Sequence, residues 1–141
     1  MLSESQASFA QRQRVAHLAT ADAGGQPHVV PICFVLLDGD FYFAIDRKPK
    51  RTTRLKRLRN IEENPAVALV IDRYDEDWSR LGWLMLQGVA SLVESGPRHD
   101  AAVAALAEKY VQYRDMVLDD RPIVRIVPER ASSWGDLDEE R

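Results

Sequence analysis

The sequence predicts a mainly β protein of the α+β class: an antiparallel sheet that curls into a small barrel, with a few helices at its edges. Two observations lead to this prediction. Five or six apolar runs of strand length follow one another at irregular spacing, and short turns such as Asp38-Gly39-Asp40 join neighbouring runs. Such turns favour hairpins and therefore antiparallel pairing. The helical patterns are too few to cover both faces of an open sheet.

Length and composition indicate a single folded domain. The 141 residues are 45% hydrophobic and 29% charged, which is typical of globular proteins. We expect one domain over residues 1–141, with a flexible acidic tail at 136–141. The single cysteine, Cys33, lies in an apolar run and has no partner for an intramolecular disulfide. With no apolar stretch of membrane-spanning length and no signal peptide, we expect a cytoplasmic protein without a membrane partner.

The first third of the chain predicts one helix and three strands. A weak helical pattern covers residues 5–13, with Phe9 as its apolar anchor. Strands are expected at 15–20, 29–37 and 41–45. The run 29–37 is almost continuously apolar, which predicts burial on both of its faces. The two glycines of residues 22–25 supply the positive φ angles of a turn.

The rest of the chain predicts a basic helix, three strands and two further helical segments. The basic helix is expected from Thr52 or Thr53 to about Glu63, with Leu55, Leu58 and Ile61 facing the core. Strands are expected at 66–71, at 83–93 with a break at Gly88, and at 122–127. Helical segments are expected at 97–110 and 113–118, and a loop at 74–80.

Charge is distributed unevenly along the chain. Between Arg47 and Arg59, eight of thirteen residues are lysine or arginine and none is acidic. The whole chain nevertheless has a formal net charge of −3, so the remainder is strongly acidic. A concentrated basic segment in an acidic chain favours a localised anion site over a general attraction to nucleic acid. We therefore expect no nucleic-acid partner.

The basic segment has the composition of a phosphate site. The hydroxyls of Thr52 and Thr53 and backbone N–H groups at a helix start, beside several cationic side chains, suit a phosphate. A solvated helix face is the alternative. Because the segment directly follows the strand at 41–45, a bound anion would lie at the rim of the barrel. A planar ring attached to it could then lie against apolar strands.

The sequence gives little indication of catalysis by side chains alone. The three histidines lack metal-ligand spacing, and the common hydrolase and nucleotide-binding motifs are absent. A cofactor is therefore expected to supply any redox chemistry. The tryptophans Trp78, Trp83 and Trp134 either wall a ring-binding cleft or fill a core or an interface.

From about Phe9 to Trp134 the chain resembles the pyridoxamine 5′-phosphate oxidase-like family. The resemblance is carried by the run at 29–34, the hairpin after it, the basic segment, Arg59-Asn60-Ile61-Glu62-Glu63-Asn64-Pro65 leading into 66–69, and Gln87-Gly88-Val89-Ala90. Segments 46–58 and 72–78 are more similar still to the branch assigned to the deazaflavin coenzyme F420. The resemblance implies a split β-barrel of the FMN/F420-binding type, as a homodimer with the cofactor site at the subunit interface.

The resemblance also implies the cofactor-binding residues. Lys56 and Arg57 match the phosphate-binding basic pair of the family, and Trp83 stands where its oxidases place a glutamine on the flavin. The predicted set also includes the strand residues before the basic loop, the cationic residues of the loop and its two threonines. The full cofactor-binding set is Ala44, Ile45, Lys48, Lys50, Arg51, Thr52, Thr53, Arg54, Lys56, Arg57 and Trp83. No metal ligand is predicted.

The departures from the family pattern indicate the cofactor. Trp83 in place of glutamine, and a basic loop with more charge than one phosphate needs, favour F420 over FMN. The Arg-x-His substrate pair of the oxidase has no counterpart around Arg125, so pyridoxamine phosphate oxidation is not expected. The predicted function is an F420-dependent oxidoreductase that transfers a hydride between the deazaflavin and a small organic substrate. The alternatives are an FMN-dependent oxidoreductase and a non-catalytic cofactor-binding protein. The proton donor stays open among Tyr42, Tyr74, Tyr110 and Tyr113.

Overall fold

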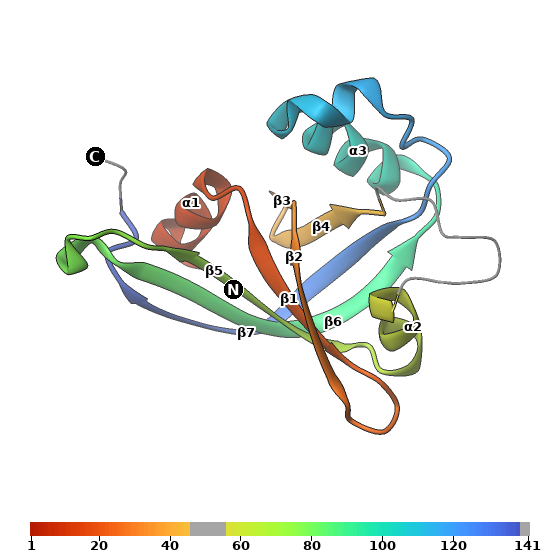
Figure 1. Ribbon diagram of the computed structural model, residues 1–141. Helices are drawn as coiled ribbons and strands as arrows, with labels where there is room; N and C mark the ends of the chain where they lie inside the picture. Colours follow the sequence, from red (N-terminus) through yellow and green to blue (C-terminus); the bar gives the residue numbers. More distant parts are fainter. Residues whose placement is uncertain (46–55, 139–141) are drawn as a thin grey trace.

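The computed structural model describes residues 1–45 and 56–138, and its centre is a curled seven-stranded antiparallel sheet (Figure 1). The strand order is β2-β1-β5-β6-β7-β4-β3. The strands are β1 (Ala16–Ala21), β2 (Pro27–Ile32), β3 (Val35–Leu37), β4 (Asp40–Ala44), β5 (Ala66–Arg73), β6 (Gly82–Val93) and β7 (Ile123–Gly135). The helices are α1 (Glu4–Arg12), α2 (Lys56–Glu63) and α3 (Pro97–Lys109), with short 3-10 turns at Trp78–Arg80 and Val111–Asp115. The predicted antiparallel split-barrel fold is confirmed.

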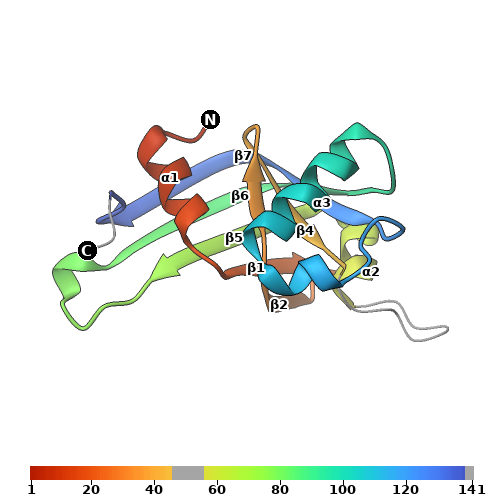
Figure 2. The same cartoon turned by 90° about the horizontal axis from the view of Figure 1, so that it is seen from above.

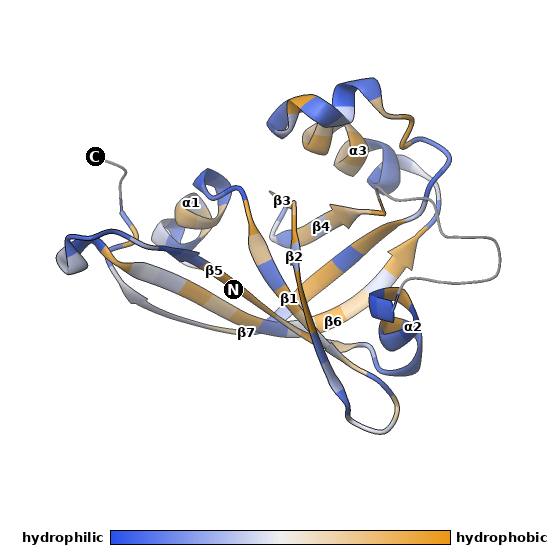
Figure 3. Ribbon diagram, viewed as in Figure 1, coloured by the Kyte–Doolittle hydropathy of each residue, from blue (hydrophilic) through white to orange (hydrophobic). Residues whose placement is uncertain are grey.

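The main core lies on the concave face of the sheet, where α1 packs, whereas α3 packs against β3 and β4 from their other side (Figures 1 and 2). Strand residues alternate between this face and the opposite one, so that Leu18, Leu69 and Leu84 point inward and are fully buried. Phe9, the predicted anchor of α1, is buried against the same cluster. A second apolar cluster forms where Leu106 of α3 packs against β3 and β4. Colouring by hydropathy shows the strands as mainly apolar and the helices as mixed (Figure 3).

A turn and a strand irregularity that were predicted from glycine are both present. The β3–β4 hairpin closes with Asp38 at φ 53° and Gly39 at φ 86°, the two positive angles of a type I′ turn. The expected irregularity at Gly88 is also confirmed, because the register between β6 and β7 shifts there and leaves Glu129 as the extra residue of β7. A Cβ at Gly88 would collide with the carbonyl of Val127, so the close approach requires glycine.

The apolar run at 29–37 is not one strand, which corrects the prediction. The chain leaves β2 after Ile32 and re-enters the sheet at Val35 as β3. Between them the backbone N–H of Phe34 donates to the Tyr110 hydroxyl at 3.0 Å, which satisfies a group that a continuous strand would pair with its neighbour. Val29 is 61% exposed, so β2 is also not buried on both faces.

The C-terminal strand is longer than predicted. It was expected to end at Val127, but β7 continues to Gly135 because polar residues after Pro128 still pair with β6. The flexibility expected of the tail stays a prediction, although Leu137 is only 8% exposed and its carbonyl accepts a hydrogen bond from Arg12 at 2.7 Å. Residues 139–141 lie outside the described part of the chain.

The remaining predicted elements occur with small changes of boundary. In α2 the described turns end at Glu63 as expected, and Leu58 and Ile61 are buried. Its predicted capping threonines and Leu55 lie outside the described residues. The expected loop at 74–80 contains a 3-10 turn at its end. None of the described helices is long and apolar enough to cross a membrane.

Candidate functional site

The first described turn of α2 presents the predicted basic pair at the side of the molecule where β4 ends (Figure 1). The helix is held by Leu58 and Ile61 in the core and by Asn60, which is fully buried and donates from Nδ2 to the Thr20 hydroxyl at 3.0 Å. This attachment leaves the flanking basic side chains outside the core. Asn60 is an anchor that apolar periodicity did not reveal, because a polar residue is not expected among the buried positions of a helix.

Lys56 already has an acidic neighbour. Its Nζ lies 3.7 Å from the carboxylate of Asp22, in the turn between β1 and β2. Backbone N–H groups of Gln26 and Gly24 also donate to that carboxylate, and they lower the pKa of Asp22 together with Lys56. Part of the Lys56 charge is therefore offset, and an incoming anion would compete with Asp22 for it.

Arg57 reaches into a cavity of about 240 Å³. Its Nε atom is buried and has no hydrogen-bond partner among the described residues. A buried guanidinium N–H without a partner is costly, and an anion in the cavity would satisfy it. The other residues that line the cavity are Val15, Pro31, Ile32, Cys33, Ala44 and Tyr113.

The structure brings only some of the predicted site residues together, and Lys56 pairs with Asp22. Ala44 and Arg57 meet in the cavity, whereas Ile45 packs in the core beside Leu58. Six of the predicted residues lie outside the described residues: Lys48, Lys50, Arg51, Thr52, Thr53 and Arg54. Trp83 is the last of the predicted set and lies elsewhere in the chain.

Sequence reasoning missed two polar residues of the cavity wall. Cys33 follows β2 and Tyr113 lies in the 3-10 turn after α3, so neither is near Arg57 in the sequence. Only the folded sheet brings them together. Of the tyrosines left open as proton donors, Tyr113 lines this cavity, while Tyr110 donates to the carbonyl of Arg14 and Tyr42 accepts from Arg98.

Trp83 is at the opposite end of the sheet. It is the second residue of β6, beside the β5–β6 hairpin that extends away from α2 in both views (Figures 1 and 2). Its side chain is 36% exposed and borders a second, mainly apolar cavity of about 260 Å³ with Val70, Asp72 and Met85. Within one chain, Trp83 and Arg57 therefore do not form one site.

The Trp83 cavity belongs to the convex face of the sheet, where α3 packs only against β3 and β4 and no described helix packs on the side chains around Trp83 (Figure 1). Side chains that alternate with the core residues of β1, β2, β5, β6 and β7 form this face, and many are apolar. We call it the outer face and define it by Ala19, Val29, Ala68, Val70, Trp83, Met85, Val89, Val127 and Trp134. Exposed apolar patches on a sheet face are typical of interaction sites.

Together these features define a split-barrel protein with a cavity lined by Arg57 at one end and an exposed apolar patch on the outer face. A family model described as pyridoxamine 5′-phosphate oxidase matches residues 2–135. The chain therefore belongs to that family.

Individual relatives are distant. A 5a,11a-dehydrotetracycline/5a,11a-dehydrooxytetracycline reductase of Streptomyces rimosus is 26% identical over 129 residues, covering 91% of this chain and 79% of the reductase. Among solved structures, a conserved hypothetical protein of Mycobacterium tuberculosis matches with a TM-score of 0.78 at 24% identity, covering 96% of this chain and 86% of that one. HutZ, the heme storage protein of Vibrio cholerae, matches with a TM-score of 0.72 at 25% identity, covering 90% and 89%.

Proposed function

We propose that this protein is an oxidoreductase that uses coenzyme F420 to transfer a hydride to or from a small organic substrate. The observation that carries the proposal is the buried Nε of Arg57, which has no hydrogen-bond partner among residues 1–45 and 56–138, in a side chain that lines a cavity with mainly apolar walls. An anionic group joined to a planar ring suits both features. Membership of the oxidase family and the similarity to a reductase support redox chemistry.

The chain's own residues would bind and orient the cofactor. Arg57 would donate to a phosphate oxygen in the cavity, and Lys56 would add charge once it turns from Asp22. Lys48, Lys50, Arg51 and Arg54, with the hydroxyls of Thr52 and Thr53, would hold the remaining negative charge of the phosphodiester and polyglutamate tail. The small side chain of Ala44 leaves room beside Arg57. When bound, F420 supplies the hydride, and apolar walls that exclude water protect it.

The proposed active form is a homodimer with each cofactor site built from both subunits. In one chain, Trp83 and Arg57 are at opposite ends of the sheet, so Trp83 can complete an Arg57 site only from a second copy. The uncovered outer face supplies an apolar surface for such a copy, and two-fold dimers are the commonest symmetric assemblies. Trp83 of one subunit would then lie near the ring of a cofactor held by Arg57 of the other.

The two alternative functions each use a different ligand, FMN or heme. FMN would use the same cavity with a single phosphate. If the ligand is heme, the protein is a non-catalytic binder. Two observations favour heme as the ligand: the similarity to a heme storage protein and the exposed side chain of His17 on β1. On the outer face His17 pairs with Val70 of β5, which places an imidazole beside an apolar surface.

The deciding experiment is a parallel titration of the purified protein with F420, FMN and heme. We expect F420 to bind more tightly than FMN, because the basic loop has more charge than one phosphate uses. Tight FMN binding without F420 binding would overturn the F420 assignment. A Soret shift that is lost in His17→Ala, with no binding of either flavin-type cofactor, would favour heme storage.

A further inference from the structure

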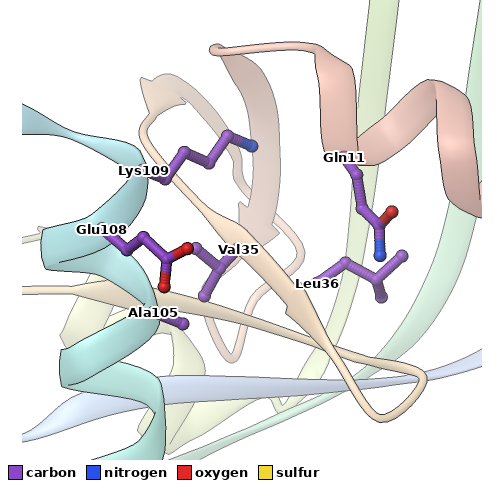
Figure 4. Close-up of a pocket in the computed structure, with 6 residues that line it drawn as sticks. All are labelled: Gln11, Val35, Leu36, Ala105, Glu108 and Lys109. Atoms are coloured by element: carbon purple, nitrogen blue, oxygen red, sulfur yellow. The ribbon is translucent and has the colours of Figure 1, made fainter.

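A third cavity, of about 350 Å³, lies between α1, β3 and α3 (Figure 4). It shares no lining residue with the Arg57 cavity or with the Trp83 cavity. Its walls combine apolar side chains from β3 and α3 with polar groups from both helices: Gln11, Val35, Leu36, Ala105, Glu108 and Lys109. It is large enough for a small organic molecule.

Lys109, the last residue of α3, places a primary amine in an unusual setting at this cavity. Its Nζ lies 4.0 Å from the ring centroid of Phe34 and 5.4 Å from that of Tyr110. The atom is covered from solvent and has no hydrogen-bond partner among the described residues. Burial, and then the nearby guanidinium of Arg14, lower the pKa of Lys109 to about 8, although Cys33 opposes the shift.

The base of the Lys109 side chain is fixed, whereas its tip has room to move. Arg14 donates to the Lys109 carbonyl and lies over the ring of Tyr110, and the N–H of Tyr110 closes the helix on Leu106. The four-carbon stem of a lysine has freely rotating bonds, so its amine can turn from the Phe34 ring into the cavity that the same side chain lines. That rotation gives up the contacts of the amine with the Phe34 and Tyr110 rings but breaks no hydrogen bond among the described residues.

An amine in this setting is a nucleophile at neutral pH. With a pKa near 8, about one Lys109 amine in ten is uncharged at pH 7, against roughly one in 2,500 for an ordinary lysine. The carboxylate of Glu108 lines the same cavity and can carry protons to and from a reacting group. Buried lysines of this kind form Schiff bases with carbonyl compounds.

We propose that the cavity between α1, β3 and α3 binds small aldehydes or ketones and that Lys109 forms a Schiff base with them there. The Nζ lone pair attacks the carbonyl carbon, and the C=O π electrons move to oxygen, which takes up a proton. The nitrogen then loses one proton and a second proton is added to the hydroxyl oxygen. The C–O bond breaks and water leaves as the nitrogen lone pair forms the C=N bond of a protonated imine. The step needs no oxidant or reductant. It does not depend on the proposed F420 chemistry.

The test uses acetaldehyde as the probe and cyanoborohydride to trap the imine, with peptide mass spectrometry to quantify each lysine. Lys56 is the matched internal control, because its Nζ is paired with Asp22 on the surface. We expect Lys109 to be alkylated at least tenfold faster than Lys56 at pH 7, with a rate that rises to a plateau above pH 8. Equal rates at the two lysines would overturn the proposal.

A second variant tests whether the cavity itself is the binding site. Ala105→Leu fills part of the cavity without changing Lys109, and Ala101→Leu adds the same side chain to an exposed position of α3. We expect Ala105→Leu to slow Lys109 alkylation at least fivefold and Ala101→Leu to leave it unchanged. Undiminished alkylation in a folded Ala105→Leu protein would contradict carbonyl binding in the cavity.

Discussion

The two faces of the sheet are built from the same strands but serve different ends. On the concave face, Leu69 and Leu84 are buried in the core cluster that also holds Phe9 of α1. Their neighbours in the sequence, Val70 and Trp83, point to the outer face and stay partly exposed. Both sides of these strands are apolar, but around Val70 and Trp83 the described elements cover only the concave side, because α3 packs farther away on β3 and β4. The concave face therefore stabilises the fold of one chain, and the outer face around Trp83 is available to a partner.

The largest expected effect follows from removing a core ring on the concave face. Phe41 is fully buried, so Phe41→Ala should lower the free energy of unfolding by about 3–5 kcal/mol. Trp134→Ala removes an aromatic ring from the outer face and should lower it by less than about 1 kcal/mol in the monomer. Urea unfolding at low protein concentration measures both. Similar losses would show that the two faces contribute equally to the fold of one chain.

The next effect should appear in assembly. Met85→Glu places a carboxylate at the middle of the outer face, where a second copy would bury it without a partner. We expect the dissociation constant of the dimer to rise at least about 100-fold, with the fold retained. Val111→Glu makes a matched charge change at an exposed valine beside α3 and should leave assembly intact. Sedimentation velocity distinguishes the two. A dimer unaffected by Met85→Glu would place the interface elsewhere.

A smaller effect is expected at the Arg57 cavity. Arg57→Ala should weaken cofactor binding about tenfold or more, because a charge-assisted hydrogen bond to phosphate is lost. Arg57→Lys should recover only part of this, since it lacks the planar guanidinium. Arg59→Ala, on the exposed side of α2, is the control. Affinities within twofold of wild type for both Lys56→Ala and Arg57→Ala would mean that the basic residues are only a solvated surface.

The smallest expected effect concerns the cluster beneath α3. The folded protein lowers the pKa of Lys109, so folding disfavours the ammonium form. That destabilisation is complete below about pH 8 and disappears as the pH rises through the ordinary pKa of 10.5, where the unfolded chain also loses the proton. Lys109→Met should therefore melt a few degrees higher than wild type at pH 7, with a gain that shrinks by pH 10.5. A rise in melting temperature that does not depend on pH would indicate that Lys109→Met stabilises the protein by better packing and not by removing a charge.

Local patterns in the sequence were sufficient for most of the fold. Asp38-Gly39 fixes a hairpin because its φ angles depend on two residues alone. Gly88 allows β6 and β7 to approach closely because glycine lacks the Cβ that would collide with the carbonyl of Val127. The pattern failed at Cys33 and Phe34, where the chain leaves the sheet because a distant hydroxyl, that of Tyr110, satisfies the backbone. It also failed after Pro128, where pairing with β6 extends a strand whose residues are too polar to indicate one.

The site was less predictable than the fold. The basic segment indicated an anion site near α2, and Arg57 and Ala44 do line one cavity. The other walls of that cavity come from segments remote in sequence, so no local pattern pointed to Tyr113. Trp83 entered the predicted site as a possible wall of a ring-binding cleft and through family resemblance, but the folded chain holds it at the other end of the sheet from Arg57. The proposed role of Trp83 in an Arg57 site therefore requires a second subunit.

Complementation between two defective variants tests this central proposal directly. Arg57→Ala and Trp83→Ala homodimers, each confirmed as folded dimers, should bind cofactor weakly. If each site takes Arg57 from one subunit and Trp83 from the other, unfolding and refolding the two together gives heterodimers with one intact site. Random pairing should then restore wild-type affinity at about one quarter of all sites. No recovery of high-affinity binding in the mixed sample, with heterodimers present, would contradict a site shared between subunits.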